Sequence, residues 1–346
     1  MKQIRIAVVT PVSARPEVGG AEHHFRGLLR ALNRGNVAAD HIQVESDESN
    51  FDSILEAYLR FYELDLSAYD GVISTKGPTY MVRHPNHICW LLHTIRVFYD
   101  MFENEFSSPT PELLDQRNLI IQADTLALSP PHTKKVFVNG AETGNRLRKY
   151  NGLDSTVLHP PLEFDWFHFQ RGDRGYAFIA SRLHRWKRID LAIRAMRHVS
   201  APMELVIAGS GEDEDRFREL AKGDPRVRFL GYVSDEEIVE WYTYARVVPF
   251  TPLREDFGYV TLEAFRSGKP VITCEDSGEP ARLVKHGVSG FVVKPEPSEI
   301  GRFLQYLWDH PEVAREMGRK GMESTQHIRW DVTRQHLLSA LGFCEG

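Results

Sequence analysis

The sequence predicts an α/β protein built from two facing Rossmann-like domains with a cleft between them. Its 346 residues exceed one ordinary core and fit two domains of about 100–200 residues each. In both halves, short apolar runs alternate with longer helical segments, a pattern typical of parallel sheets covered by helices on both faces. Between the halves, His159-Pro160-Pro161 and the aperiodic stretch 163–174 interrupt regular structure, so we place a domain boundary there.

The first half carries the first series of strands and helices. A buried parallel strand is predicted over residues 4–12, followed by a Gly19-Gly20 turn and a helix from Ala21 to about Asn33. The stretch from 94 to 124 is predicted as helix, loop, helix. The further strands of this half are predicted at 41–45, 71–75, 88–93, 125–129 and 135–139.

The second half repeats the pattern after the boundary. Its strands are predicted at 176–181, 205–209, 227–230, 246–250, 270–274 and 290–293. Helices are predicted to begin near Lys187, Glu212, Ser234, Tyr259 and Pro297. The tail over 311–341 is predicted as two helices, with Trp330 anchoring the last one on the first domain. The predicted domains are therefore 1–165 and 166–325, with a crossing helix in 326–346.

Composition and charge exclude several classes of protein. A formal net charge of −6 argues against non-specific nucleic-acid binding, which requires a basic surface. Cys89, Cys274 and Cys344 are scattered, which favours a reducing compartment over a disulfide framework or a zinc site. No export signal or run of about 20 apolar residues is present, so a cytoplasmic protein is expected. Peripheral contact with the inner face of a membrane stays open, because tracts 90–102 and 146–150 mix basic and aromatic residues; core packing explains them equally well.

The stretch from Glu255 to Ala264 carries the strongest indication of a ligand site. It follows the apolar strand 246–250 and leads into a helix, at the sheet edge where ligands bind α/β proteins. Gly258 lets the backbone approach a ligand closely. Glu255 and Glu263 can accept hydrogen bonds from vicinal hydroxyls, a combination that favours a nucleotide-sugar.

A basic loop, 181–188, follows the first strand of the second domain. Arg182 and Lys187 are spaced so that both can reach one diphosphate, and together they can neutralise its charge. The alternative is a solvated basic loop, which is unfavourable at a helix start unless an anion binds there. Arg185 and Arg188 are expected to lie at the surface.

Weaker indications come from turns and from one histidine. Gly19-Gly20 and Gly209 each follow a strand and can admit a ligand, although plain turns have the same sequence. The stretch 231–233 (Gly231, Tyr232 and Val233) is expected to contact a nucleobase through its main chain. His93 ends a strand and could contact a sugar, with Asp100 orienting it; a structural role is the alternative.

Six motifs occur in the order found in one enzyme family. They are Gly19-Gly20-Ala21-Glu22, His93-Thr94…Arg96…Tyr99-Asp100, Ser181-Arg182…Lys187-Arg188-Ile189-Asp190, Gly209-Ser210-Gly211-Glu212, Phe229-Leu230-Gly231, and Glu255-Asp256-Phe257-Gly258…Glu263. With them the chain resembles the retaining family 4 glycosyltransferases of the GT-B fold along nearly its whole length. It most resembles bacterial mannosyltransferases of polysaccharide and O-antigen assembly.

The resemblance implies transfer of a hexose from a nucleotide-diphosphate sugar to a glycan or lipid-linked acceptor, with no metal or other cofactor. GDP-mannose is the leading donor, and a UDP-hexose is the alternative. The first domain would face the acceptor and the second would bind the donor. The implied catalytic residues are His93, Arg182, Lys187 and Glu255. The implied donor-binding residues are Gly19, Gly20, Arg182, Lys187, Gly209, Gly231, Tyr232, Val233, Glu255, Phe257, Gly258 and Glu263.

Three departures from the family pattern leave the sugar and the acceptor open. They lie at Ser277-Gly278-Glu279-Pro280-Ala281-Arg282, at Asn139-Gly140-Ala141-Glu142 and at Ile95. An epimerase or phosphorylase of the same plan, or an inactive nucleotide-sugar-binding assembly subunit, are the competing hypotheses. Loss of transfer predicts disruption of Arg182, Lys187, Glu255 or Glu263, and all four are present.

Overall fold

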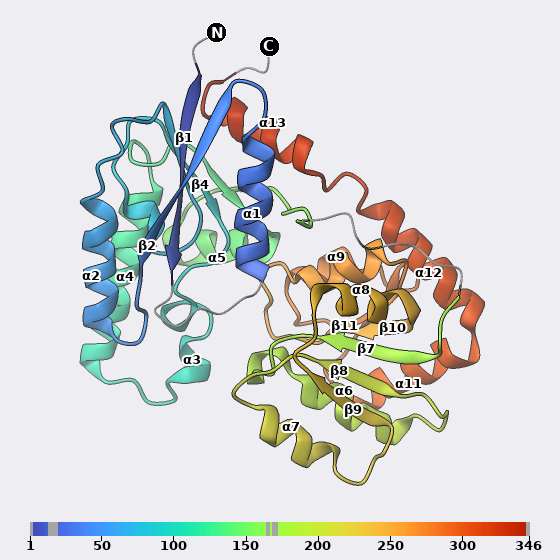
Figure 1. The fold of residues 1–346 in the computed structure, drawn as a ribbon. Coiled ribbons are helices and arrows are strands. Elements are labelled where there is room, and N and C mark those ends of the chain that lie inside the picture. The colour runs from blue at the N-terminus through green and yellow to red at the C-terminus, as the bar shows by residue number, and fades with distance from the viewer. Residues whose placement is uncertain (1–2, 13–19, 164–166, 168–171, 344–346) are drawn as a thin grey trace. The chain divides into compact units, whose positions relative to one another are not determined.

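The computed structural model describes residues 3–12, 20–163, 167 and 172–343 (Figure 1). The chain divides into two compact units. One unit comprises Met1–Glu163 and Ile328–Gly346, and the other comprises Phe164–His327. Each unit contains a six-stranded parallel sheet, so the predicted α/β class is confirmed.

The first unit has the strand order β2-β1-β3-β4-β5-β6. Every residue of β3, β4 and β5 is buried, as expected for parallel strands covered on both faces. The strands are β1 (Ile4–Val12), β2 (Val37–Glu45), β3 (Gly71–Ser74), β4 (His87–Leu91), β5 (Val136–Val138) and β6 (Thr156–Val157).

One predicted strand of this unit is wrong. Residues 125–129 lie at the end of the 18-residue helix α4 (Pro111–Leu128), which Thr110 caps by accepting a hydrogen bond from the Leu113 backbone N–H. A short apolar run inside a helix has the same local pattern as a buried strand, so periodicity alone does not separate them. The sixth strand is β6, whose two exposed residues are too few to form an apolar run.

Helices flank the first sheet, and the last helix of the chain is one of them. They are α1 (Gly20–Leu32), α2 (Phe51–Tyr62), α3 (Phe102–Glu105), α4, α5 (Ala141–Asn151) and α13 (Trp330–Ala340), with short 3-10 turns η1 (Thr79–Met81) and η2 (Arg96–Phe98). The predicted anchor is confirmed: Trp330 packs against Gly27 of α1, and its Nε1 donates to the Leu162 carbonyl at 2.6 Å. Helix α13 thus belongs to the first unit.

The second unit has the strand order β12-β11-β10-β7-β8-β9. Its order reverses between β7 and β10, which is the switch point at which doubly wound sheets bind ligands. The strands are β7 (Tyr176–Ala180), β8 (Leu205–Ala208), β9 (Val227–Gly231), β10 (Ala245–Pro249), β11 (Val271–Cys274) and β12 (Gly290–Val293).

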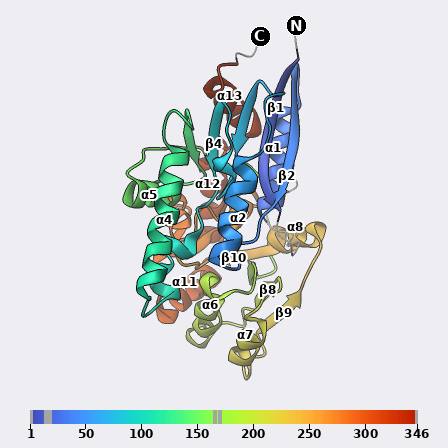
Figure 2. The ribbon, with the colours of Figure 1, turned by 90° about the vertical axis from the view of Figure 1, so that its left-hand side faces the viewer.

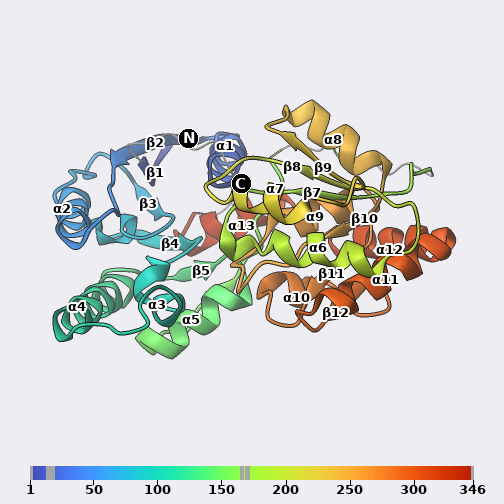
Figure 3. The same ribbon diagram turned by 90° about the horizontal axis from the view of Figure 1, so that it is seen from below.

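Helices cover both faces of this sheet. Helices α6 and α11 enclose one apolar core, and α8 and α9 enclose the other (Figures 1 and 3). Ser234 and Glu237 form the capping box of α8. The helices are α6 (Ile189–Ala195), α7 (Glu214–Ala221), α8 (Asp235–Tyr244), α9 (Tyr259–Arg266), α10 (Glu279–Leu283), α11 (Pro297–Asp309) and α12 (Pro311–Ser324), with 3-10 turns η3 (Arg185–Lys187) and η4 (Met196–His198).

The tract 90–102 contributes largely to the interior of the first unit, whereas in the tract 146–150 Arg148 and Lys149 are exposed. Trp90 and Tyr99 are fully buried. Arg146 is also buried and pairs with Asp100 at 2.7 Å. Core packing therefore accounts for these side chains. In the part of the chain that the structure describes, no helix combines the length and apolarity needed to cross a membrane.

Candidate active site

The candidate site in the second unit is formed by loops at the carboxyl ends of neighbouring strands. The loop after β7 carries Arg182 and Lys187, and the loop after β10 carries Glu255. Because β7 and β10 pair at the switch point, these two loops leave adjacent strands in the same direction. The topology therefore brings together two motifs that lie far apart in the sequence.

Lys187 and Glu255 meet in an ion pair. The Lys187 Nζ donates to both carboxylate oxygens of Glu255, at 2.8 Å each. The two side chains are 27% and 18% exposed, so water screens the pair less than it would at an open surface. Lys187 ends the 3-10 turn η3, which His184 caps by accepting a hydrogen bond from the Trp186 backbone N–H.

Arg182 forms a more open pair with Glu212 on the neighbouring loop. Its Nε and Nη2 donate to the two carboxylate oxygens at 3.2 and 3.3 Å, and both side chains are half-exposed. Burial raises the pKa of Glu212, but its hydrogen bonds and the charges of Arg182 and His184 outweigh burial, so the pKa lies below its usual value. Glu212 stays ionised at neutral pH.

The Glu255 loop is held by the loop after β11. The Glu255 backbone N–H donates to the Ser277 carbonyl, and the Glu255 carbonyl accepts from the Glu279 N–H, both at 2.9 Å. Gly278 lies between them with φ of 77°, and a Cβ there would approach the Glu255 carbonyl oxygen to 2.4 Å. The segment in which the sequence departs from the family pattern therefore fixes the Glu255 backbone.

The start of α9 follows this loop. Gly258 precedes the helix with φ of 75°, where its Cβ-free backbone passes within contact of Phe250 and Pro280. Phe257 is buried. Glu263 lies on α9 and accepts a hydrogen bond from the Tyr242 hydroxyl at 2.8 Å.

The loop after β8 lies directly against the basic loop. A Cβ on Gly209 would stand 2.0 Å from the Ser181 carbonyl oxygen, so glycine is required there by close backbone approach. The Gly209 N–H donates to the Gly231 carbonyl at 2.8 Å, which joins the loop after β8 to the end of β9. Beyond it, Tyr232 is 79% exposed and Val233 packs partly on the core.

The other predicted site residues, His93, Gly19 and Gly20, belong to the first unit. His93 follows β4 and is half-buried, with Nδ1 3.0 Å from the Thr94 carbonyl oxygen. Asp100, the expected orienter of His93, forms ion pairs with Arg96 and Arg146 at 2.7 Å each. Gly20 is the first residue of α1, and Gly19 lies outside the described residues.

Arg188 corrects one sequence expectation. It was expected at the surface, but its side chain is only 17% exposed and pairs with Asp276 at 2.6 Å. Asp276 was not singled out in the sequence either. Nothing in the local pattern distinguishes Arg188 from Arg185, because the difference arises from a partner 88 residues away.

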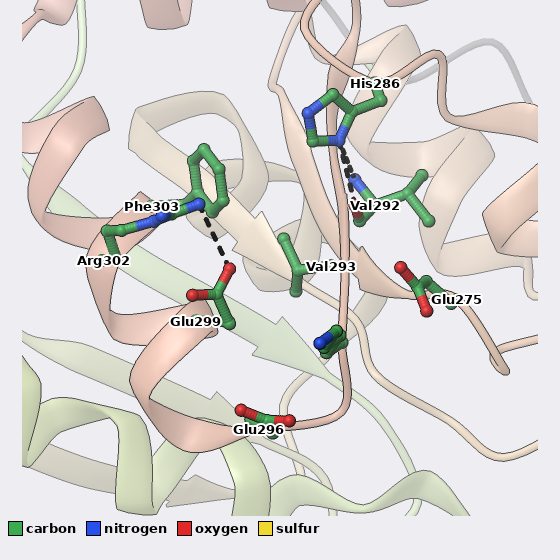
Figure 4. A pocket seen from close by; sticks show the side chains of 9 residues that line it. Glu275, His286, Val292, Val293, Glu296, Glu299, Arg302 and Phe303 are labelled. Atoms are coloured by element: carbon green, nitrogen blue, oxygen red, sulfur yellow. Dashed lines mark hydrogen bonds and ion pairs between the residues drawn. The ribbon is translucent and has the colours of Figure 1, made fainter.

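A hollow of about 330 Å³ lies at another edge of the second unit, beside β12 and the start of α11 (Figure 4). Its lining mixes carboxylates, such as Glu296, with Lys294 and Arg302, and Arg302 pairs with Glu299 at 3.1 Å. No residue of the predicted site lines it. Across the described ranges, no group of three or more His, Cys, Asp or Glu side chains is arranged to hold a metal ion.

Residues 163–324, nearly all of the second unit, match the family model described as glycosyl transferases group 1. The matched segment is therefore similar to the group 1 glycosyl transferases over 162 of the 346 residues of the chain. The predicted resemblance to glycosyltransferases is thereby confirmed.

Curated relatives extend the likeness. The D-rhamnosyltransferase WbpZ of Pseudomonas aeruginosa is 31% identical over 194 residues, which cover 52% of this chain and 51% of that protein. The alpha-1,3/1,6-mannosyltransferase ALG2 of Homo sapiens is 28% identical over 229 residues, or 58% and 53% of the two chains. The chain thus spans about half the length of these curated relatives.

Among solved structures, HepE of Anabaena in complex with UDP and glucose matches with a TM-score of 0.73 and 17% sequence identity. The match covers 98% of this chain and 100% of that chain. At this identity the likeness concerns the fold alone, and it confirms the predicted GT-B fold.

Proposed function

We propose that the protein is a retaining hexosyltransferase that transfers a sugar from a nucleotide-diphosphate donor to a glycan or lipid-linked acceptor in the cytoplasm. The observation that carries the proposal is the Lys187–Glu255 pair at the switch point of a group 1 glycosyl transferase unit. One member suits a diphosphate and the other suits sugar hydroxyls. A single ion pair thus contains one residue suited to the diphosphate of the donor and one suited to its sugar.

Donor binding is expected to break the ion pair between Lys187 and Glu255. The donor diphosphate competes with the Glu255 carboxylate for Lys187, while Arg182 exchanges the half-exposed Glu212 for phosphate oxygens. Glu255, once released, accepts hydroxyls of the sugar beside the backbone of Phe257 and Gly258. Diphosphate binding and sugar binding are therefore coupled through one side chain.

The remaining predicted residues complete the proposed donor site. Glu263 accepts the ribose hydroxyls, and the backbone at Gly209 and over 231–233 contacts the nucleotide. From the first unit, Gly19-Gly20 and His93 are proposed to contact the diphosphate and the sugar. No metal or cofactor is required, because Lys187 and Arg182 supply the positive charge.

Retention follows from front-face attack in this proposal. The bond between the sugar carbon and the diphosphate oxygen breaks, and the acceptor oxygen bonds to that carbon on the same face. The leaving phosphate oxygen takes the acceptor proton. Lys187 and Arg182 stabilise the negative charge that develops on the diphosphate, which is the step where fixed charges contribute most.

GDP-mannose is the leading donor. D-rhamnose is 6-deoxymannose, so the names of the rhamnosyl and mannosyl relatives both point to the manno configuration. A UDP-hexose is the second candidate, because HepE, which has the same fold, was crystallised with UDP and glucose. Peripheral contact with a membrane remains part of the proposal only for a lipid-linked acceptor.

A donor screen tests the proposal. The natural protein is incubated with GDP-mannose, UDP-glucose and their nucleotides, and thermal stabilisation and donor hydrolysis are measured. We expect stabilisation and slow hydrolysis with GDP-mannose. Stabilisation by none of these compounds would contradict the function, whereas binding without hydrolysis or transfer would favour an inactive nucleotide-sugar-binding subunit.

A further inference from the structure

We propose that Arg188 is a positioning residue, which fixes Lys187 and Glu255 relative to each other. The inference rests on the proposed function for its catalytic consequence. Arg188 itself is not assigned a donor contact in this scheme, because its guanidinium is hydrogen-bonded to protein oxygens. Its role is to join three of the loops that build the site, those after β7, β10 and β11.

The guanidinium of Arg188 makes four hydrogen bonds. Two go to the Asp276 carboxylate, from Nη1 at 2.7 Å and from Nη2 at 2.6 Å. The other two go to backbone carbonyls of the β10 loop, from Nε to Thr251 at 2.9 Å and from Nη2 to Pro252 at 2.8 Å. Such a planar fork, matched to fixed oxygens on two loops, cannot be reproduced by an ammonium group.

These bonds act directly on the two charged residues of the site. Arg188 follows Lys187 in the chain, and Thr251 and Pro252 lie three to four residues before Glu255. Asp276 precedes Ser277, whose carbonyl accepts the Glu255 backbone N–H. One side chain therefore ties the segment carrying Lys187 to both segments that hold Glu255.

The backbone supports the same interpretation. Arg188 has φ of 47°, in the left-handed region that disfavours residues with a Cβ. The strained turn is held on both sides: the Thr251 hydroxyl donates to the Arg188 carbonyl at 3.2 Å, and the Leu253 N–H donates to the Trp186 carbonyl at 2.7 Å. A residue kept in this conformation at a ligand edge indicates a geometric requirement.

The chain provides a matched control in Arg226. Its guanidinium also bonds an aspartate, Asp224, through Nε at 2.9 Å and Nη2 at 2.7 Å. It also donates to the backbone carbonyls of Met196, Val199 and Ala201. This arginine lies just before β9, at the end of the strand opposite to the site loops. Its loss removes a comparable bonding pattern without touching Lys187 or Glu255.

The test compares Arg188→Gly, Arg188→Lys and Arg226→Gly in the full chain. Glycine accepts the left-handed backbone, so Arg188→Gly removes the guanidinium without adding strain. We expect Arg188→Gly to lower kcat/KM for the donor by at least about tenfold, chiefly through kcat, and Arg188→Lys not to rescue it. Arg226→Gly should lower the melting temperature while leaving kcat/KM within about twofold. Equal kinetic losses in Arg188→Gly and Arg226→Gly, or full rescue by lysine, would overturn the inference.

A second measurement needs no donor. Competitive acetylation followed by mass spectrometry gives the reactivity of Lys187 relative to the exposed Lys222. We expect Arg188→Gly, but not Arg226→Gly, to raise that ratio, because the pair with Glu255 loosens. An unchanged ratio in Arg188→Gly would refute the positioning role even if nucleotides bind. A natural protein that binds no nucleotide while the ratio rises would instead refute the proposed function alone.

Discussion

At the residue scale, the central feature of the candidate site is the ion pair between Lys187 and Glu255, which a bound anion would have to displace. Lys187 is bonded to both oxygens of Glu255, so a diphosphate gains Lys187 only by displacing a carboxylate. That exchange costs affinity for the bare nucleotide. A donor that carries a sugar can regain this affinity, because the sugar hydroxyls can donate hydrogen bonds to the released Glu255 carboxylate. Under the proposed function, the pair should therefore favour a complete donor over its nucleotide product.

The variant Glu255→Gln separates the effect of Glu255 on nucleotide affinity from its effect on sugar transfer. Without the carboxylate, Lys187 is free for phosphate and a repulsive charge is lost, so affinity for GDP or UDP should rise on the order of tenfold. Transfer should fall by about 10²–10³, since the sugar loses its charged acceptor. Lys187→Ala should weaken nucleotide binding instead. Calorimetric titration and donor turnover measure both effects.

The control for this comparison is Glu204→Gln, which breaks a half-exposed pair with Arg228 in the same unit. Its nucleotide affinity should match that of the natural protein. Weaker GDP and UDP binding in Glu255→Gln would show that Glu255 does not compete with the diphosphate.

At the element scale, helices of the first unit are joined by close packing and by a buried polar network around Asp124. Helices α2 and α4 stand side by side (Figure 2), where the Tyr58 hydroxyl donates to Asp124 at 2.5 Å. The Tyr99 hydroxyl donates to the other Asp124 oxygen at 2.7 Å. Burial raises the pKa of Asp124 to about 6, although the tyrosine hydrogen bonds lower it.

This pKa predicts a pH dependence of stability. The Asp124 pKa is higher in the folded than in the unfolded chain, so between about pH 4 and pH 6 the folded state binds the extra proton. Its contribution is therefore greatest below pH 4 and is lost as pH rises through about 6, by about 3 kcal/mol. Asp124→Asn removes this dependence. Denaturant unfolding of both proteins from pH 4 to pH 7 gives the difference, with exposed Asp115→Asn as control. A constant difference would contradict the raised pKa.

The contact between α1 and α13 gives a second prediction at this scale. A Cβ at Gly27 would stand 2.3 Å from the Trp330 ring. Helix propensity favours alanine over glycine by about 1 kcal/mol, yet Gly27→Ala should destabilise the protein by about 1–3 kcal/mol through overpacking. Gly172→Ala, whose added Cβ meets nothing within 4 Å, serves as control in thermal unfolding. Stabilisation by Gly27→Ala would show that α13 does not pack tightly on α1.

At the scale of the whole molecule, the chain forms two compact units that share one polypeptide. The second unit is a single segment, whereas the first unit is closed by the C-terminal residues from Ile328. The Lys187–Glu255 pair and its supporting loops all lie in the second unit. In the proposed function, most donor contacts therefore come from the second unit, whereas the α1–α13 contact belongs to the first unit.

This separation predicts two transitions in calorimetric unfolding. A nucleotide at about 100 times its Kd should stabilise the second unit by about 2.7 kcal/mol and shift mainly one transition. Gly27→Ala should shift mainly the other, because it disturbs only the first unit. Both treatments acting on one transition would contradict the assignment of the nucleotide to the second unit.

Much of this organisation was determined by the sequence alone. Apolar runs predicted most strands, and Lys187, Glu255 and Gly258 were each identified because they follow a strand and precede a helix. These sequence patterns are local. In a parallel sheet the residues that follow the strands all lie at the same edge, so the fold places them close together. The wrong strand at 125–129 shows the limit of local patterns, since an apolar run inside α4 looks the same.

The tertiary structure alone decided what depends on distant partners. Arg188 and Arg185 are alike in the sequence, and only the fold brings Asp276, 88 residues away, to Arg188. The pairing of Lys187 with Glu255 likewise spans 68 residues. A sequence specifies which side chains lie at a strand end. Which of them meet is set by strand order and loop packing, because charges interact through space.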